Sequence, residues 1–352
     1  MPVILGFVIG AQCWSPCGAA LSGSRVPPDD PRLTYCGAWE CDSEDVSTVY
    51  GGSQLKLYLS GKARLLFRPG TGRSLMLSVR EGKSVIWRGI PPESGLELNS
   101  GTTTSCFSVI YVAANRIPAV ASSTNCRADE WRISGLLVES GSILVPSPMP
   151  LKRLMVEFLG DSITSGDGLC GRSGNPLVDA DASLTYAFLL AERLGCSYRI
   201  RGYPGASPRI VTDKLVWLDK GRTIKEDLKP DMVFINLGAN RRVDSDVQYL
   251  SDMKGLVEGI RDQYAGVKIV LMNFFRMTPD RMPVLASLAK KYPGEVSVFD
   301  ARPYLVGYSD SGVHPDKESH RRLAAALEEI VIKRPDRPNT SAPASGQKGR
   351  QP

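Results

Sequence analysis

Leu154-Met155-Val156-Glu157-Phe158-Leu159-Gly160-Asp161-Ser162-Ile163 is the most informative stretch of this chain. Its first six residues are mostly apolar and predict a buried strand, and the glycine that follows predicts that the strand ends in a tight turn. Open α/β sheets bind their ligands beyond the carboxyl ends of their strands. A serine at that edge exposes its hydroxyl where a substrate would lie, so Ser162 is a candidate nucleophile.

The pattern on both sides of this stretch predicts an α/β domain. Strands are expected at 153–159, 197–201, 231–236, 267–272 and 295–299, and helices near 183–194, 244–263, 279–291 and 315–332. Strands that alternate with helices in this way are typical of a doubly wound, mostly parallel sheet. We therefore predict a catalytic α/β domain over residues 151–333.

The preceding part of the chain has a different periodicity. Short alternating runs such as Gln54-Leu55-Lys56-Leu57-Tyr58-Leu59 and Phe107-Ser108-Val109-Ile110-Tyr111-Val112 are separated by glycine-rich turns. Several strands at such short spacing predict an all-β sandwich. We place this domain at residues 31–146, and the stiff connector Pro-Ser-Pro-Met-Pro at 146–150 marks the boundary.

Composition limits what the chain binds. The formal net charge of +6 lies mostly in the last twenty residues, 333–352, which hold five basic residues and one acidic residue. The segment 334–352 is poor in apolar residues and is predicted to be a disordered basic tail. The rest of the chain is close to neutral, which argues against nucleic-acid binding.

The N-terminus and the cysteines favour export. Residues 1–30 are predicted to be a signal or a flexible segment, because the apolar stretch Val3 to Ala11 resembles a secretory signal but lacks its positive start. This stretch is too short to span a bilayer, so no membrane anchoring is expected. Eight cysteines, an even number, are compatible with disulfides and a secreted protein. Their spacing fits no zinc site, so no metal is expected.

The second half contains the groups that acyl transfer requires. Ser162 can attack a carbonyl carbon, and His314 can take its proton and return it to the leaving alcohol. The backbone N–H groups of Ser162 and Gly205 and the side-chain amide of Asn240 can stabilise the oxyanion. The chain has only two histidines, and His320 is expected to be structural. Asp161 is expected to support the serine turn.

Ser162, Gly205, Asn240 and His314 match, in order, the four residues for which the SGNH (GDSL-type) hydrolases are named. This resemblance implies that Ser162 is the nucleophile, Gly205 and Asn240 are oxyanion donors and His314 is the base. The first half is similar to the N-terminal jelly roll of carbohydrate esterase family 2. Its matching segments are Tyr35-Cys36-Gly37-Ala38-Trp39 and Gly51-Gly52-Ser53-Gln54-Leu55.

The family resemblance implies a carbohydrate acetylesterase. Such a hydrolase removes acetyl groups from acetylated oligo- or polysaccharides, of the xylan or glucomannan type, and needs no cofactor. Two departures from the family pattern matter. Asn240 is followed by Arg241-Arg242 where the family commonly has an aspartate, and the acid usually found three residues before the histidine is replaced by Ser311. Either Asp310, one residue earlier, or a backbone carbonyl is expected to orient His314.

The sequence is also compatible with two other functions, and it contains one misleading motif. The same residues would serve an acyltransferase in which a sugar hydroxyl replaces water, and the irregularity at Ser311 is compatible with a non-catalytic carbohydrate-binding protein. Gly166-Asp167-Gly168-Leu169-Cys170-Gly171 matches the dinucleotide-binding pattern, but its glycines do not lead directly from the strand into a helix. A nucleotide site is therefore not expected.

Overall fold

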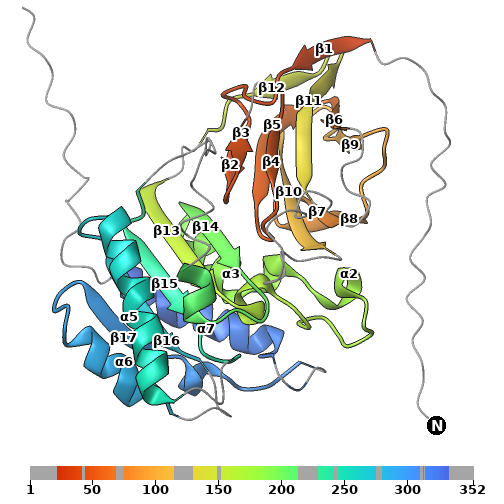
Figure 1. Ribbon diagram of the computed structural model, residues 1–352. Helices are drawn as coiled ribbons and strands as arrows, with labels where there is room; N and C mark the ends of the chain where they lie inside the picture. The colour runs from red at the N-terminus through yellow and green to blue at the C-terminus, as the bar shows by residue number, and fades with distance from the viewer. Residues whose placement is uncertain are drawn as a thin grey trace, which may run out of the picture.

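The computed structural model describes residues 22–41, 44–68, 75–114, 130–148, 152–212, 229–240, 245–274, 280–309, 312 and 314–332. They form a β-sandwich and an α/β domain that pack against each other (Figure 1). This confirms the predicted fold class, an all-β jelly-roll sandwich followed by a parallel α/β sheet. The predicted N-terminal segment is described only from residue 22, and the predicted tail lies outside the described residues.

The sandwich consists of two antiparallel sheets. The first has the order β3 (Glu40–Cys41), β4 (Val46–Thr48), β11 (Trp131–Glu139), β6 (Lys62–Phe67) and β9 (Leu96–Asn99), with β1 (Gly23–Val26) beside β11. The second has the order β12 (Ile143–Val145), β5 (Gln54–Ser60), β10 (Ser105–Ala114), β7 (Leu75–Glu81) and β8 (Ser84–Gly89), with β2 (Thr34–Cys36) beside β5. Strand β1 pairs along β11, so the sheet includes residues before position 31, where the domain was predicted to begin.

Alternation along the strands fills the core between the two sheets. Leu55, Leu57 and Leu59 of β5 have no exposed surface, as the period of two along a strand requires. An aromatic cluster belongs to this core, in which the rings of Trp39 and Trp131 are 4.9 Å apart. The core is therefore shared by both sheets.

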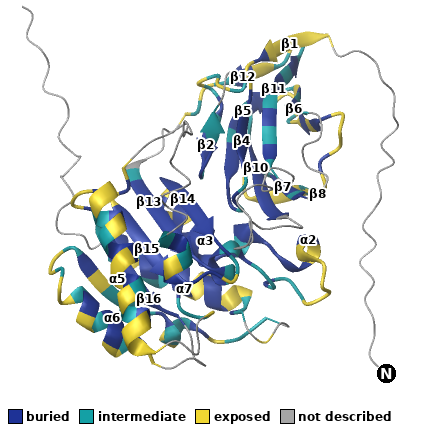
Figure 2. Cartoon of the chain, viewed as in Figure 1, coloured by how far each residue is buried: buried dark blue, intermediate teal, exposed yellow. Residues whose placement is uncertain are grey.

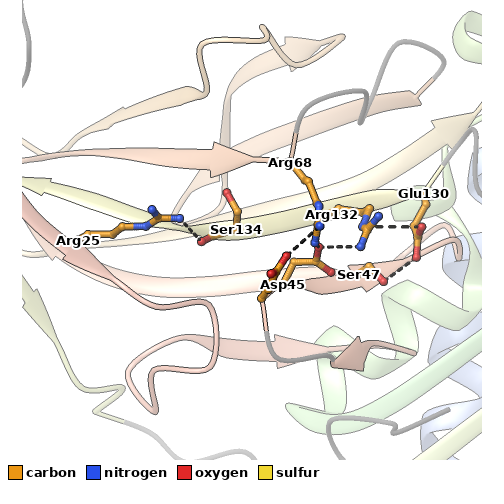
Figure 3. A network of polar contacts seen from close by, with 8 residues as sticks. Arg25, Asp45, Ser47, Arg68, Glu130, Arg132 and Ser134 are labelled. Carbon is orange, nitrogen blue, oxygen red and sulfur yellow. Dashed lines mark hydrogen bonds and ion pairs between the residues drawn. The ribbon is translucent and has the colours of Figure 1, made fainter.

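Charged side chains join the strands of the first sheet (Figure 3). Asp45 is almost fully buried and accepts hydrogen bonds of 2.7 Å from both Arg68 and Arg132, while Ser47 donates to Glu130. A buried carboxylate is tolerated when it is paired in this way. The network ties β4 to β11 and to the residue that follows β6, and so supports their register.

The α/β domain is built on five parallel strands. Their order is β14 (Cys196–Gly202), β13 (Lys152–Gly160), β15 (Met232–Asn236), β16 (Lys268–Asn273) and β17 (Val296–Asp300). All five agree with the predicted strands to within one residue at each end. Because β13 comes first in the chain but lies between β14 and β15, the strand order reverses there. Such a switch point opens a crevice at the carboxyl ends of the strands.

Helices cover both faces of the parallel sheet (Figure 1). Helices α3 (Tyr186–Leu194) and α7 (Lys317–Ile332) pack on one face, and α5 (Asp246–Gln263) and α6 (Met282–Ala289) pack on the other. The shorter elements are α1 (Ser162–Ser165), α2 (Pro176–Asp179), η2 (Ala182–Leu184) and η3 (Arg302–Tyr304). Buried residues line the sheet on both faces, as expected for a parallel sheet (Figure 2).

Buried apolar clusters extend across the boundary between the two domains. Cys36, Ile110 and Val112 of the sandwich belong to the same buried cluster as the residues of α3 and β14. Polar contacts surround it: Arg88 forms an ion pair with the buried Asp181, and Lys56 and Glu192 are 2.8 Å apart. The interface is therefore a continuation of the domain cores.

Candidate active site

The predicted serine turn lies at the carboxyl end of β13. A side chain at Gly160 would meet Thr164 Oγ1 at 2.0 Å, so only glycine allows the chain to turn this closely. Asp161 has no exposed surface, and its Oδ1 accepts the backbone N–H of Ile163 at 3.0 Å. This bond caps the single turn of α1, whose first residue is Ser162. The half-buried serine therefore sits on a short helix with its N–H at the helix start.

His314 reaches the serine from the other end of the chain. Its Nε2 lies 2.9 Å from Ser162 Oγ, which is the distance of a hydrogen bond. The segment before α7 is held by the bond from Ser309 N–H to the backbone carbonyl of His314, at 2.8 Å. Burial lowers the pKa of His314 and favours the neutral imidazole that a general base needs.

The group that orients His314 is not assigned. Asp310 and Ser311 lie outside the described residues. The choice between the Asp310 carboxylate and a backbone carbonyl therefore stays a prediction.

Gly205 lies on a turn beside the serine. The turn runs from Tyr203 to Ala206, closed by the bond from Ala206 N–H to the Tyr203 carbonyl at 2.9 Å. Pro204 and Gly205 hold the two central positions, and Gly205 has φ of +74°, the combination that a type II turn requires. No atom lies within 4 Å of where a Cβ of Gly205 would stand. Among the described residues, the N–H groups of Ser162 and Gly205 have no protein acceptor.

Asn240 joins the turn to the serine elbow. Its Nδ2 donates to Asp161 Oδ2 and to the backbone carbonyl of Ala206, both at 3.2 Å. Asn240 itself is exposed and follows β15, so the amide lies at the switch point and can be reached from solvent. The sequence predicted Asn240 as a donor but not the carboxylate that holds it. The sequence indicates Asp161 only as support for the turn, because contacts between residues 79 positions apart leave no local signal.

The Asp161 carboxylate lies in an unusual environment. Burial raises its pKa to about 7, although the Ile163 N–H stabilises the charged form. Burial and the neighbouring charge of Asp161 likewise raise the pKa of Asp167 to about 7. Two carboxyl groups that titrate near neutrality therefore lie next to the serine.

His320 faces the start of α3. It is buried, and its Nδ1 accepts the N–H of Tyr186, the first residue of α3, at 2.9 Å. Its ring stacks on the Tyr186 ring, with centroids 5.9 Å apart. Burial lowers the pKa of His320 to about 3. These contacts support the predicted structural role, and a second catalytic base would need an exposed nitrogen.

Neither a metal site nor a membrane-spanning helix is found in the described part of the chain. No group of three or more potential metal ligands occurs there. None of its helices is both long and apolar enough to cross a bilayer.

Comparisons with known proteins agree with this architecture. The chain is similar to a family two carbohydrate esterase from Cellvibrio japonicus, with a TM-score of 0.69 and 16% identity over 89% of this chain and 98% of that one. A family two carbohydrate esterase from Clostridium thermocellum in complex with cellohexaose has a TM-score of 0.68 and 17% identity, covering 85% and 98%. A salicylyl-acyltransferase from a tetracycline biosynthetic pathway has a TM-score of 0.61 and 15% identity, covering 88% and 97%. No curated protein sequence matches the chain.

The parallel sheet and the serine at its switch point define the class, an α/β hydrolytic enzyme of the SGNH type. Residues 158–330 match the GDSL-like Lipase/Acylhydrolase family, and this part of the chain is a GDSL-like acylhydrolase domain. The similarity to family two carbohydrate esterases extends to the sandwich and shows that both domains share that fold.

Proposed function

We propose that this protein is a serine esterase that removes O-acetyl groups from carbohydrate through an acyl-enzyme intermediate. The observation that carries the proposal is the 2.9 Å contact between Ser162 Oγ and His314 Nε2. A nucleophile within hydrogen-bond reach of a neutral imidazole is the arrangement that covalent catalysis needs.

The proposed reaction has two halves. His314 Nε2 takes the hydroxyl proton as Ser162 Oγ bonds to the acetyl carbon, and the carbonyl oxygen becomes an oxyanion. When the C–O bond to the sugar breaks, His314 gives this proton to the leaving alcohol. Water then attacks the acetyl-serine in the same way, and acetate and free serine result. Asp310 or a backbone carbonyl keeps the other imidazole nitrogen oriented.

Three donors are proposed for the oxyanion. The N–H groups of Ser162 and Gly205 have no acceptor among the described residues and are free to serve. Asn240 would donate through an amide that now bonds to Asp161 and Ala206, so it must share or exchange one of these bonds. The removal of one such donor typically costs about 3–4 kcal/mol of transition-state stabilisation.

The substrate is proposed to be an acetylated oligo- or polysaccharide of the xylan or glucomannan type. The shared two-domain fold with family two carbohydrate esterases supports this choice. The same fold also occurs in an acyltransferase, so transfer to a sugar hydroxyl is the second candidate function. Secretion and a catalytic domain at 151–333 belong to the same proposal, and the sandwich domain, predicted at 31–146, also includes strand β1.

Acetate release from a panel of acetylated polysaccharides tests the function. The wild-type protein should release acetate, and Ser162→Ala should not, while both bind glycan equally. Product analysis with and without an acceptor sugar separates hydrolysis from transfer. If wild type and Ser162→Ala were equally inert while both bound glycan, the protein would be a binding protein.

A further inference from the structure

The turn that carries Gly205 is in contact with the other domain. Tyr203, which begins this turn, is buried, and its N–H donates to the carbonyl of Gly160 at 2.8 Å. Its ring packs against the Tyr50 ring in a T-shaped arrangement, with centroids 6.2 Å apart and an interplanar angle of 85°. The two hydroxyl oxygens are 3.4 Å apart. Tyr50 belongs to the loop between β4 and β5, in the sandwich.

The Tyr50 loop is anchored firmly in the sandwich. Thr48 Oγ1 accepts the N–H of Tyr50 at 3.2 Å and itself bonds to the carbonyl of Ala38 at 2.7 Å. The Tyr50 carbonyl accepts the N–H of Ser53 at 3.2 Å, and the N–H of Gly52 donates to Tyr111 on β10 at 2.7 Å. These bonds leave the loop little freedom to move.

The same loop lies tightly against the α/β domain. A side chain at Gly52, which has φ of +84°, would meet Ile200 Cδ1 of β14 at 2.9 Å. The hydroxyl of Tyr198, also on β14, donates to the Gly52 carbonyl at 2.8 Å. Tyr50 shares a buried apolar cluster with Tyr203 and Ala206, the two ends of the Gly205 turn. The loop thus transmits the position of the sandwich to this turn.

We propose that Tyr50 is a positioning residue that holds the Gly205 turn through Tyr203, so that the sandwich forms part of the catalytic apparatus. The proposal rests on the proposed function, in which Gly205 N–H is an oxyanion donor. Such donors act because they are already in place when charge develops. A misplacement of about 1 Å can cost about 100-fold in rate.

The test compares Tyr50→Leu with Tyr50→Phe and with Lys56→Met. Leucine keeps an apolar side chain at a buried position but removes the ring that packs against Tyr203. Phenylalanine keeps the ring and should rescue. Lys56→Met is the matched control, because it breaks the ion pair with Glu192 across the same interface without touching the Gly205 turn.

On a small acetyl ester, Tyr50→Leu should lower kcat about 10- to 100-fold with KM within about threefold. Tyr50→Phe and Lys56→Met should stay within about threefold of wild type in both constants. If Tyr50 only stabilised the interface, Tyr50→Leu and Lys56→Met would have the same kcat when both are assayed well below their melting temperatures. Wild-type kcat in Tyr50→Leu would overturn the proposal.

Hydrogen exchange of the segment 203–206 gives a readout that does not depend on activity. Exchange should be faster in Tyr50→Leu than in Lys56→Met or wild type. If the wild-type protein has no esterase activity but the segment still exchanges faster in Tyr50→Leu, the proposed esterase is refuted and the positioning role stands. If exchange in Tyr50→Leu equals that of wild type, the positioning role alone is refuted. If Tyr50→Leu does not fold, Tyr50→Met takes its place with the same expected result, and Tyr50→Phe should exchange like the wild type.

Discussion

At the residue scale, Asp161 connects two parts of the proposed oxyanion hole. One of its oxygens caps the helix turn that begins with Ser162, and the other accepts the amide of Asn240. Both oxygens of a carboxylate can accept, whereas a carboxamide offers one acceptor and one donor. Asp161 can therefore accept from both partners at once, one with each oxygen. An asparagine at this position would have a single acceptor oxygen, so one of the two bonds would be lost.

Asp161→Asn tests this double role. We expect kcat on an acetyl ester to fall about 10- to 100-fold, somewhat less than the loss of a whole oxyanion donor, because one of the two bonds can persist. Steady-state kinetics and the melting temperature together measure the effect. Asp167→Asn is the control, since Asp167 is a neighbouring half-buried carboxyl whose Oδ1 has no partner among the described residues. Equal activity of both variants would contradict the role given to Asp161.

The pH dependence of kcat/KM separates Asp161 from the histidine base. In wild type, the acid limb should lie near pH 7, because burial raises the pKa of Asp161 to about 7 and the ionised carboxylate is the form that accepts both donors. Activity should be present above this pH and lost as the pH falls. In Asp161→Asn the acid limb is set by the protonation of His314. Because burial lowers the pKa of His314 from its usual 6.5, this limb should move below pH 6.5. A limb below pH 6.5 in both proteins would show that ionised Asp161 is not required.

The sequence indicates the proposed nucleophile and base more readily than the residues that hold them in place. Ser162 and His314 could be paired because the chain has only two histidines and a glycine-aspartate-serine turn after a strand. Tyr50 could not be found in this way, since it touches Tyr203 from a position 153 residues away, across a domain boundary. The contacts that place donors are tertiary, whereas the groups that react are marked by residue type.

At the scale of elements, His320 of α7 sets the start of α3. The first N–H groups of a helix have no partner within it, and here Nδ1 of His320 accepts the one from Tyr186. Only the neutral imidazole can accept this bond and remain buried. Burial lowers the pKa of His320 to about 3. The folded state is therefore less stable in acid, because only the unfolded state can take up the proton.

His320→Asn should make the stability less dependent on pH. The unfolded histidine titrates near 6.5, so below this pH the unfolded state binds a proton that the folded state refuses. Wild type should therefore lose about 2 kcal/mol from this group between pH 6.5 and 5. Asparagine can accept the Tyr186 N–H without titrating, although its loss of ring packing lowers the stability at pH 7. Urea unfolding at both pH values measures the difference. If the free energies of unfolding of wild type and His320→Asn differed by the same amount at both pH values, this account would be contradicted.

Most elements were predictable, and the exceptions have clear causes. The strands of the parallel sheet were found because buried parallel strands are continuous apolar runs between helices. Helix α1 was not expected, since four residues are too few for a helical period and its start depends on Asp161. Strand β1 was missed because its residues Gly23–Val26 are mostly exposed and become a strand only by pairing with β11.

At the scale of the whole molecule, the interface is arranged so that the domains unfold together. The apolar cluster of α3 and β14 includes Cys36, Ile110 and Val112 from the sandwich, so separation of the domains would expose these side chains to water. Each apolar side chain fully buried contributes about 1.5–3 kcal/mol. Loss of the interface would therefore remove a large part of the stability that holds either domain.

Arg88→Ala tests whether the domains unfold as one unit. The change leaves Asp181, whose side chain is 4% exposed, without its ion-pair partner across the interface, and should cost about 1–3 kcal/mol. Trp39, Trp87 and Trp131 lie in the sandwich, whereas Trp217 falls within residues 151–333, so the measurement is made in a Trp217→Phe background. All described α-helices lie in the α/β domain, so in that background tryptophan fluorescence and circular dichroism at 222 nm follow different domains. Both transitions should coincide and shift by the same amount. The control Arg64→Ala removes an exposed ion pair with Glu97 within the sandwich and should change stability by less than about 1 kcal/mol. If Arg88→Ala shifted only one of the two transitions, the domains would be independent folding units and the sandwich would not be needed to keep the α/β domain folded.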